Sequence, residues 1–374
     1  MRTAVVILNW NTEGFLRDFL PVLLRSVEQV EGAEVVVADN DSTDSSMELM
    51  SEVFPQVKTL QFDTNLGFTG GYNEAFRLIS EQYGRPEYFV LINSDIEVTD
   101  GWLEPLTTWM DSHPDCGACA PKLHSWQDRK MFEYAGAAGG YLDRFGYPLC
   151  RGRVLKNLEE DKGQYDSPAD VFWATGACLM VRSSVYKKLG GLDERFFAHM
   201  EEIDLCWRMQ LEGWKVTVVP SSTVYHVGGG TLPPTSPFKL FLNYRNNLLM
   251  LGNNLAKTYA LGFYHRGMDA CQAARKGMRK ATRRIRMRMV LDGLSAAVYL
   301  VTFRKDCFMA VVNAHREYRK LLKTSSQEQI CGYIGSYGDN AEVRGIYRKW
   351  IVLRSMILGQ KVHGSIRAED FYKF

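Results

Sequence analysis

Six polar side chains follow three apolar runs in the first hundred residues, at positions where a ligand could bind. They are Asn9, Asn11, Asp39, Asn93, Ser94 and Asp95. The Asp39 carboxylate could accept a hydrogen bond from the imide of a pyrimidine base. Asp95 could ligate Mg²⁺ or Mn²⁺, hard cations that prefer oxygen ligands and would bridge two phosphates. Asn, Asp and Ser are also the ordinary residues of turns and helix caps, so each segment alone has a structural explanation as well.

Three acids, Glu201, Glu202 and Asp204, open a segment with helical periodicity. One glutamate could act as a general base, which requires a carboxylate within hydrogen-bond reach of the attacking hydroxyl. The apolar residues just before it would raise its pKa if they line the same pocket. The structural alternative is that the helix dipole stabilises acids in a first turn by about 0.3 to 1 kcal/mol. Asp204 and Arg208, four residues apart, could equally form an ion pair on the helix.

His226 follows an apolar run and precedes three glycines, so it could supply a nitrogen ligand next to a diphosphate. A single histidine is, however, also a common structural residue. Eight cysteines are scattered along the chain, and the sequence predicts no disulfide framework. Only Cys116 and Cys119 have redox or zinc spacing; because no second pair completes a zinc site, we expect them to be buried thiols.

The elements that would position these residues alternate along the first hundred residues. Strands are predicted at residues 4–8, 34–38, 59–62 and 88–92, and helices at residues 14–29, 43–53 and 70–83. Such alternation is typical of a mostly parallel sheet flanked by helices, which binds ligands at the carboxyl ends of its strands. Pro21 predicts a turn with a helix starting near it, and Ser45 with Glu48 predicts a capping box.

The rest of the chain divides into two parts. An apolar segment at 171–181, which contains Trp173 and Gly176, and a strand at 215–220 complete a catalytic domain over residues 1–235. Prolines then interrupt the chain, and residues 236–374 are predicted to form a helical, basic and amphipathic region. Its apolar run at 290–301 is too short to span a bilayer.

The composition and the missing motifs narrow the function classes. The chain has 374 residues, 46% of them hydrophobic and 24% charged, as in a folded globular protein. No phosphate-binding P-loop occurs, and no Gly-x-Gly-x-x-Gly follows the first strand, which argues against P-loop enzymes and dinucleotide oxidoreductases. The first apolar run is too short for a signal peptide, so we expect a cytoplasmic catalytic part.

Taken in order, the segments resemble glycosyltransferase family 2, and within it bacterial rhamnosyltransferase-like enzymes that build cell-surface polysaccharides. The matching segments are residues 5–11, 36–44, 65–68, 93–95, 176–179, 201–206 and His226. Each segment is weak alone, but together they are specific, and the resemblance covers roughly residues 1–250. A sugar-1-phosphate nucleotidyltransferase is a less fitting α/β alternative, because no glycine-rich basic loop follows the first strand.

The resemblance implies a GT-A fold, with a helical C-terminal extension here, and an inverting transfer from a nucleotide-diphosphate sugar, UDP- or dTDP-linked. It implies that Asp39 binds the pyrimidine and that Asp95 is the last acid of an Asp-x-Asp motif whose first acid is replaced by Asn93. His226 would complete a site for Mn²⁺ or Mg²⁺. The family's base falls on Glu202, with Glu201 and Asp204 as alternatives.

The remaining expected contacts follow from the same resemblance. Asn65 and Gly67 fall in the loop that lies against the nucleotide, together with Asn9, Asn11, Asn93 and Ser94 on the donor side. Trp173 and Gly176 are expected on the side of a glycan or lipid-linked acceptor. An enzymatically silent sugar-nucleotide-binding protein or membrane scaffold is the alternative, motivated by Asn93 and by Glu202, which stands where the family's Glu-Asp pair has its aspartate.

The basic stretch of the C-terminal region has no comparably specific match. Its charged residues are Arg275, Lys276, Arg279, Lys280, Arg283, Arg284, Arg286 and Arg288. They are interleaved with Met278, Ile285, Met287 and Met289, a pattern suited to an anionic membrane surface on the inner face of the cell membrane. A helical face that packs on the catalytic domain, or on a second subunit in a homodimer, is the equal alternative. Nucleic acid is not expected, because no recognition motif accompanies the charges.

Overall fold

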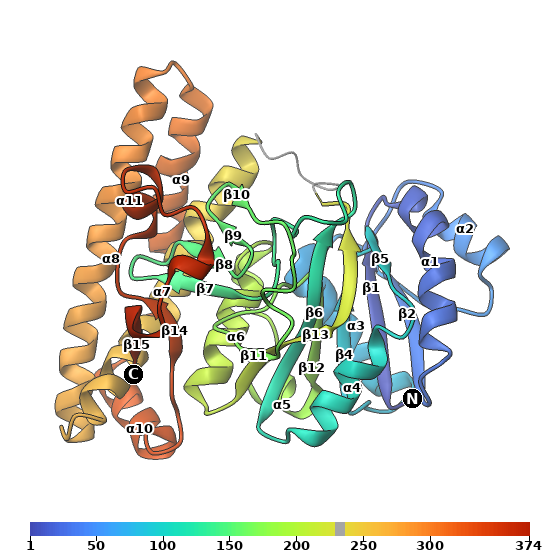
Figure 1. The fold of residues 1–374 in the computed structure, drawn as a ribbon, viewed down its shortest axis with the longest axis horizontal. Coiled ribbons are helices and arrows are strands. Elements are labelled where there is room, and N and C mark those ends of the chain that lie inside the picture. The colour runs from blue at the N-terminus through green and yellow to red at the C-terminus, as the bar shows by residue number, and fades with distance from the viewer. Residues whose placement is uncertain (229–235) are drawn as a thin grey trace.

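The computed structural model describes residues 1–228 and 236–374 (Figure 1). Its main sheet has the strand order β11-β13-β6-β12-β4-β1-β2-β3, and β5 pairs with β13. The strands are β1 (Thr3–Asn9), β2 (Ala33–Asp39), β3 (Lys58–Gln61), β4 (Tyr88–Ile92), β5 (Ile96–Val98), β6 (Cys116–Ser125), β11 (Ala169–Asp170), β12 (Cys178–Arg182) and β13 (Lys215–His226). The predicted strands of the first hundred residues are confirmed.

Strands β3, β2, β1 and β4 run parallel, and β6 and β13 are parallel to each other. Between these groups lies β12, which is antiparallel to both β4 and β6. The register of β1 and β2 pairs Asn9 with Asp39, so two of the predicted ligand residues end adjacent strands side by side. The sheet is therefore mixed, with its carboxyl-end loops gathered at one edge.

Helices cover both faces of this sheet, because alternate side chains of each strand are buried on opposite sides. In β1, Ala4 and Val6 belong to one core and Val5 and Ile7 to the other. The helices of this part are α1 (Glu13–Val27), α2 (Ser46–Val53), α3 (Gly67–Gln82), α4 (Leu103–Ser112), α5 (Ser183–Lys188), α6 (Glu201–Leu211) and the 3₁₀ turn η1 (Glu194–Phe196).

Two local predictions, the turn at Pro21 and the capping box at Ser45, are wrong. Helix α1 begins at Glu13 and runs through Pro21 without a break, because its buried face, which includes Leu16 and Leu20, packs into the core. Ser45 makes no capping bond at α2; the backbone N–H of Ser46 donates instead to the Asp44 carboxylate at 3.1 Å. Tertiary packing outweighs local propensity at the first site, and a neighbouring acid replaces the expected cap at the second.

The C-terminal part consists of α7 (Pro237–Tyr264), α8 (Ala270–Val301), α9 (Lys305–Leu321), α10 (Gln327–Tyr337), α11 (Ile351–Met356) and the 3₁₀ turns η2 (His363–Ser365) and η3 (Ala368–Asp370). A second sheet joins it to the first part, in the order β10-β9-β8-β7-β14-β15. Its strands are β7 (Gly140–Asp143), β8 (Pro148–Cys150), β9 (Arg153–Val154), β10 (Asn157–Leu158), β14 (Arg344–Tyr347) and β15 (Phe371–Lys373). The predicted boundary at residue 235 and the glycines and prolines at 229–234 lie outside the described residues.

Helix α8 packs tightly on α7, and part of its basic sequence is turned inward. A Cβ at Gly277 would lie 2.6 Å from the carbonyl oxygen of Ala256, so the two helices approach closely. Arg288 is buried and donates to Asp292 at 2.8 Å and to Asn247 at 2.6 Å. In the described part of the chain, no helix is long and apolar enough to cross a membrane.

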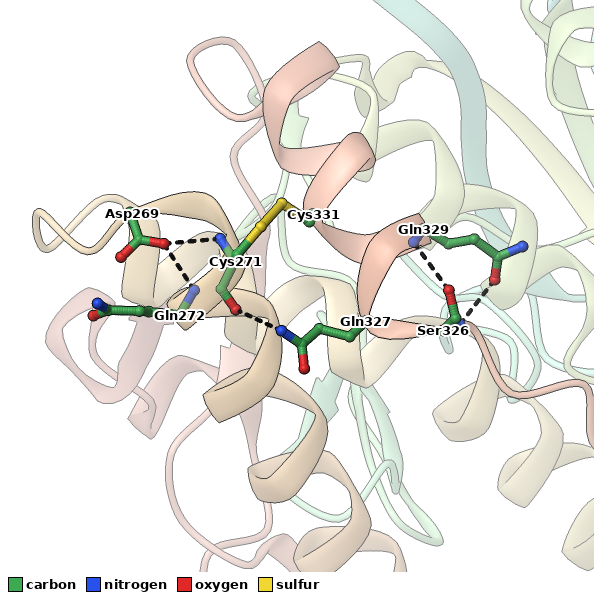
Figure 2. Close-up of a disulfide and its surroundings, with 7 residues drawn as sticks. All are labelled: Asp269, Cys271, Gln272, Ser326, Gln327, Gln329 and Cys331. Atoms are coloured by element: carbon green, nitrogen blue, oxygen red, sulfur yellow. Dashed lines mark hydrogen bonds between the residues drawn. A yellow bond between two sulfur atoms is a disulfide. The ribbon is translucent and has the colours of Figure 1, made fainter.

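One disulfide corrects the expectation drawn from cysteine usage. Cys271 at the start of α8 is bonded to Cys331 in α10, although sixty residues separate them (Figure 2). The pairing depends on α10 packing beside the first turns of α8, which the sequence pattern does not reveal. The other six cysteines are free and buried, including Cys116 and Cys119 as predicted.

Candidate active site

The loop after β2 holds Asp39 in a closed network of hydrogen bonds. One carboxylate oxygen accepts from the Asn9 side chain at 2.8 Å, and the other accepts from the Ser42 backbone at 3.0 Å. Asn11, with a positive φ of 54°, accepts from the Thr43 backbone at 2.7 Å and so ties the β1 loop to the β2 loop. Asp39 is fully buried. Each carboxylate oxygen can accept a further hydrogen bond, but the side chain is buried, so a base would reach it only if the residues that cover it moved.

A second loop, before α3, is fixed by Asn40. Its side chain donates to Asn65 at 3.0 Å and to the Gly67 carbonyl at 3.1 Å, and accepts from the Leu66 backbone at 2.9 Å. Gly67 has a φ of +69°, and a Cβ there would lie 2.4 Å from the Phe197 ring. Only glycine fits this backbone conformation and this contact. Asn65 and Gly67 are thus placed beside the Asp39 loop.

Asp95 and His226 are brought together, as the sequence predicts. The Asp95 carboxylate lies 3.2 Å from Nε2 of His226 and accepts from the Gly228 backbone at 3.2 Å. On the other side of the ring, Nδ1 lies 3.3 Å from Glu133, a residue that the sequence analysis missed. Although burial opposes the positive charge, Asp95 and Glu133 raise the pKa of His226 to about 10.

This arrangement fits a divalent cation in the chemistry of its donor groups. A carboxylate oxygen and an imidazole nitrogen are adjacent, and a second carboxylate lies on the Nδ1 side of the ring, although Nδ1 forms no hydrogen bond with a described residue. Because the raised pKa keeps the imidazole protonated, a cation would have to displace the proton from Nε2 to bind there. Among residues 1–228 and 236–374, no group of three or more His, Cys, Asp or Glu side chains forms a complete cage. The protein thus offers two ligands, and phosphates and water would have to supply the rest.

The loop that leads into α6 has a strained backbone. Phe197, His199 and Met200 all have positive φ, at 64°, 71° and 73°. Residues without a glycine's freedom adopt this region at a cost of about 1 to 3 kcal/mol each, and only where the surroundings enforce it. The Phe197 carbonyl accepts from the backbone of Phe68 at 2.8 Å, which connects the loop to the first turn of α3.

Asn246 of α7 enforces the same loop from the other side. It is fully buried, and its amide donates to the carbonyls of Phe196, Ala198 and His199 at 2.9, 2.7 and 2.8 Å. Neighbouring Arg245 donates to the Phe196 carbonyl at 2.7 Å. The sequence analysis missed both residues, because a polar pair in a long helix looks like an ordinary surface feature.

Glu201 and Glu202 follow this loop at the start of α6. One carboxylate oxygen of each, Oε2, is buried and accepts no hydrogen bond from any described residue. Burial raises the pKa of Glu202 to about 7, and burial together with the neighbouring Glu202 raises the pKa of Glu201 well above its ordinary value. A carboxyl that titrates near neutrality can accept a proton at physiological pH.

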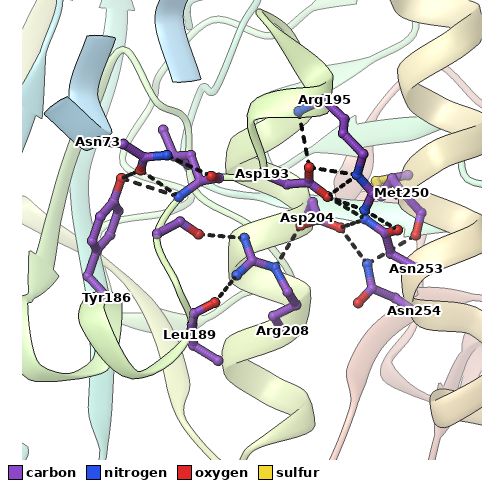
Figure 3. Close-up of polar contacts among 12 residues, drawn as sticks. Asn73, Tyr186, Leu189, Asp193, Arg195, Asp204, Arg208, Met250, Asn253 and Asn254 are labelled. Atoms are coloured by element: carbon purple, nitrogen blue, oxygen red, sulfur yellow. Dashed lines mark hydrogen bonds and ion pairs between the residues drawn. The ribbon is translucent and has the colours of Figure 1, made fainter. Parts of the chain in front are cut away.

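Asp204 has a different environment from the two glutamates (Figure 3). It is fully buried, accepts from Arg208 at 2.7 Å, and accepts from Asn253 and Asn254 at 3.0 and 2.8 Å. The predicted ion pair with Arg208 is confirmed. Both oxygens of Asp204 accept hydrogen bonds and fasten α6 to α7, whereas Glu201 and Glu202 each keep an oxygen without such a bond from a described residue.

Of the two residues expected at the acceptor, Gly176 lies beside the acids and Trp173 does not. A Cβ at Gly176 would lie 3.5 Å from the Cβ of Glu202 and 3.3 Å from Phe68. Next to it, the Ala177 carbonyl accepts from Asn93 at 2.9 Å, so the turn of Asn93, Ser94 and Asp95 adjoins the acid pair. Trp173 is only 2% exposed, and it packs on Gly140 as a core residue.

The mixed sheet flanked by helices, with polar loops at the carboxyl ends of β1, β2 and β4, is the architecture of a GT-A fold. The sequence profile of glycosyl transferase family 2 matches residues 4–190. The chain therefore belongs to glycosyl transferase family 2 and is a glycosyltransferase, as the sequence predicted.

Among its relatives is the N-acetylglucosaminyl-diphospho-decaprenol L-rhamnosyltransferase of Mycobacterium tuberculosis, 28% identical over 59% of this chain and 75% of that protein. The rhamnosyltransferase WbbL of Escherichia coli is 25% identical over 56% of this chain and 78% of its own length. A crystal structure of GalNAc-T7 with UDP, GalNAc and Mn²⁺ is similar with a TM-score of 0.50 at 16% identity. The match covers 67% of this chain and 48% of that one, and it supports the GT-A fold alone.

Proposed function

We propose that the enzyme transfers a sugar from a UDP- or dTDP-sugar to an acceptor hydroxyl, with inversion at the anomeric carbon, in cell-surface polysaccharide synthesis. dTDP-rhamnose is the first donor to test, because two relatives are named as rhamnosyltransferases. The observation that carries the proposal is the acid pair, Glu201 and Glu202, whose buried oxygens lack hydrogen bonds from the described residues. Buried carboxylates that lack hydrogen bonds have a raised pKa, which suits them to proton transfer.

In the proposed reaction, Glu202 accepts the proton of the acceptor hydroxyl. The hydroxyl oxygen forms a bond to the anomeric carbon while the bond from that carbon to the diphosphate breaks, so a nucleoside diphosphate leaves. Glu202 is favoured over Glu201 because it is the less buried of the two and adjoins Gly176. Its pKa of about 7 lets it take up the proton near neutral pH.

The donor would lie along the carboxyl ends of the strands. Asp39 binds the base once the residues that cover it move, and the loops of Asn9, Asn11, Asn65 and Gly67 form the walls of the nucleotide site. Asn93 and Ser94 lie in the turn that presents Asp95. The proximity of the β1 and β2 loops, which are joined through Asn11 and Thr43, supports this assignment.

We assign the divalent metal, Mn²⁺ or Mg²⁺, to Asp95 and His226. The 3.2 Å separation of their ligating atoms and the position of Glu133 at the far side of the ring support this. When bound, the cation would neutralise charge on the leaving diphosphate. The protein's own part is to hold Asp95 through Gly228 and to orient the imidazole.

The acceptor is proposed to be a glycan or a lipid-linked sugar, and the relative acting on a decaprenol-linked substrate supports the second. Gly176 would lie on the acceptor side. The proposed organisation is a catalytic domain over residues 1–235 and a helical region over 236–374, cytoplasmic and peripheral on the inner face of the membrane. A homodimer through the same helices is the competing use of that region.

The test is release of nucleoside diphosphate from a panel of UDP-, dTDP- and GDP-sugars, with Mn²⁺ or Mg²⁺ and with membrane extract as acceptor. The expected result is release from one donor that requires metal and is abolished in Asp95→Asn. A matched control is Asp100→Asn, an exposed aspartate just beyond β5, which should leave release unchanged.

Tight donor binding without release, even with membrane extract present, would contradict the proposal and favour a silent sugar-nucleotide-binding protein. Release of nucleoside diphosphate that is insensitive to chelation would support the transferase activity and contradict its metal dependence.

A further inference from the structure

The outer face of α8 is unusual for a surface helix, because large apolar side chains line it. Met287, Val290, Leu294, Val298 and Val301 are 42, 64, 61, 58 and 72% exposed. Their spacing of three or four residues places them on one side of the helix. This side is roughly opposite the buried face that packs on α7, so no helix described in the structure covers it.

The row ends in the turn between α8 and α9, at the top of Figure 1, where the two helices extend beyond the body of the molecule. Leu300 is 48% exposed and Phe303 is 88% exposed, with a positive φ of 58° that turns the chain there. An aromatic ring almost wholly in water at a projecting turn has lost the burial that usually stabilises such residues.

Toward its N-terminus the apolar row merges with an open, basic surface on the same helix. Its lining residues are Met278, Arg279, Thr282, Arg283, Arg286, Met287 and Val290. Met287 and Val290 therefore belong to both features, which makes them one continuous surface. Along α8, the one acid is Asp292, which is fully buried and paired with Arg288.

The charged residues at the turn and on α9 do not cancel the positive charge of this surface. Arg304 and Lys305 are exposed beside the exposed Asp306, and on α9 Lys320 pairs with Glu317 at 3.3 Å. The surface thus combines an apolar end with an uncompensated row of arginines.

We propose that this surface, the α8–α9 face, docks on an anionic lipid bilayer, with the Phe303 turn and the apolar row entering the interface and Arg279, Arg283 and Arg286 binding lipid phosphates. Apolar burial combined with cation attraction is the way peripheral helices bind membranes. A second copy of the chain is disfavoured as the occupant, because the described residues of this face of α8 offer no acid to meet a partner's arginines.

The inference deepens the proposed function, since a lipid-linked acceptor lies in a membrane, but its test does not depend on catalysis. Native protein is sedimented with vesicles of phosphatidylcholine containing phosphatidylglycerol and with vesicles of phosphatidylcholine alone, without any donor. We expect binding to the first and weak binding to the second, with binding lost as salt rises.

Three variants test separately the apolar and the basic parts of the α8–α9 face. Phe303→Glu and Arg283→Glu should each weaken binding to the anionic vesicles by about tenfold, whereas Phe303→Trp should retain it. Val53→Glu is the matched control: Val53 is 53% exposed at the end of α2, at the opposite side of the molecule in Figure 1. All replaced side chains are exposed, so thermal unfolding should change little.

Equal binding to both kinds of vesicle, or none to either, would overturn the proposal. A native dimer in light scattering that Phe303→Glu converts to a monomer would overturn it in favour of self-association. Failure of donor turnover would leave the sedimentation result unchanged, so the two hypotheses fail separately.

Discussion

The loops after β1 and β2 and the loop before α6 lie in the same site, yet they are built in opposite ways. Around Asp39, both carboxylate oxygens are bonded, to Asn9 and to the Ser42 backbone. Before α6, three residues have positive φ, and the acids that follow keep buried oxygens without hydrogen bonds from the described residues. The carboxylate of the first region is hydrogen-bonded at both oxygens within the protein, whereas the carboxylates of the second region each keep an oxygen without a bond from a described residue.

Under the proposed function, this difference separates the part of the site that binds the donor from the part that carries out the chemistry. Satisfied hydrogen bonds give a rigid frame that can receive a nucleotide, whereas unsatisfied, desolvated carboxylates are destabilising and are retained where their elevated pKa is used. Asn246, which belongs to the C-terminal region, supplies three of the bonds that hold the strained loop. The C-terminal helices therefore contribute to the site itself.

The largest effect is expected when the proposed base is neutralised. Glu202→Gln keeps the shape of the side chain and should lower kcat by about 10³-fold, with little change in the KM for donor, because a general base contributes at this scale. Steady-state release of nucleoside diphosphate measures it. Glu74→Gln, the same change at a surface acid of α3, is the control and should be silent.

The second largest effect on kcat is expected when the Asn246 amide, which holds the loop before α6, is removed. Asn246→Ala should lower kcat by about 10²-fold through misplacement of Glu202, with donor KM little changed. Asn253→Ala, on the same helix, removes bonds to Asp193 and Asp204 instead and should reduce stability with little change in kcat.

If both variants lowered kcat only in proportion to their folded fraction, the positioning role of Asn246 would be refuted. Asn246→Asp sharpens the test, because it sets a carboxylate against three carbonyls and should lower kcat at least as far as Asn246→Ala.

Stability should move in the opposite direction from activity at Glu202. Its folded pKa, about 7, is above the ordinary value of 4.5, so the folded state loses stability as the pH rises from 4.5 to about 7, and the penalty is fully present above pH 7. Glu202→Gln should thus raise the free energy of unfolding by about 3 kcal/mol at a pH near 8. The gain should vanish near pH 4, where the native carboxyl is protonated in both states, and urea unfolding at the two pH values checks this.

At Asp39 the corresponding amide substitution should lower the free energy of unfolding instead of raising it, and this is the smallest of the expected effects. In Asp39→Asn an amide N–H₂ must face either the Asn9 amide or the Ser42 N–H, so we expect a loss of about 1 to 3 kcal/mol in the free energy of unfolding. Urea unfolding of the variant measures it. A stabilised Asp39→Asn protein would contradict the contrast between the two regions.

Much of the first region was predictable, because its signals are local. Short apolar runs located the strands, and the polar residues that follow them predicted the loops that carry Asn9, Asp39 and Asp95. His226 and Asp95 met as expected, although 131 positions separate Asp95 from His226 in the numbering.

The second region was only partly predictable, because its decisive contacts are long-range. The acids were found from their place in a helical pattern, but nothing local separates Asp204, which is bonded by α7, from Glu202, which is not. Glu133, Asn246 and the Cys271–Cys331 link depend on packing between distant segments. Trp173 was misplaced for the same reason, since Gly140 makes room for its ring in the core.

The most direct test of the central claim, that Glu202 is a desolvated base, is the pH dependence of kcat/KM for donor turnover. With a pKa of about 7, activity should fall tenfold per pH unit below that value, as the carboxyl takes up a proton, and reach a plateau above it. The residual activity of Glu202→Gln should lack this limb. A native profile that is flat through neutrality, or a limb that persists in Glu202→Gln, would contradict the claim.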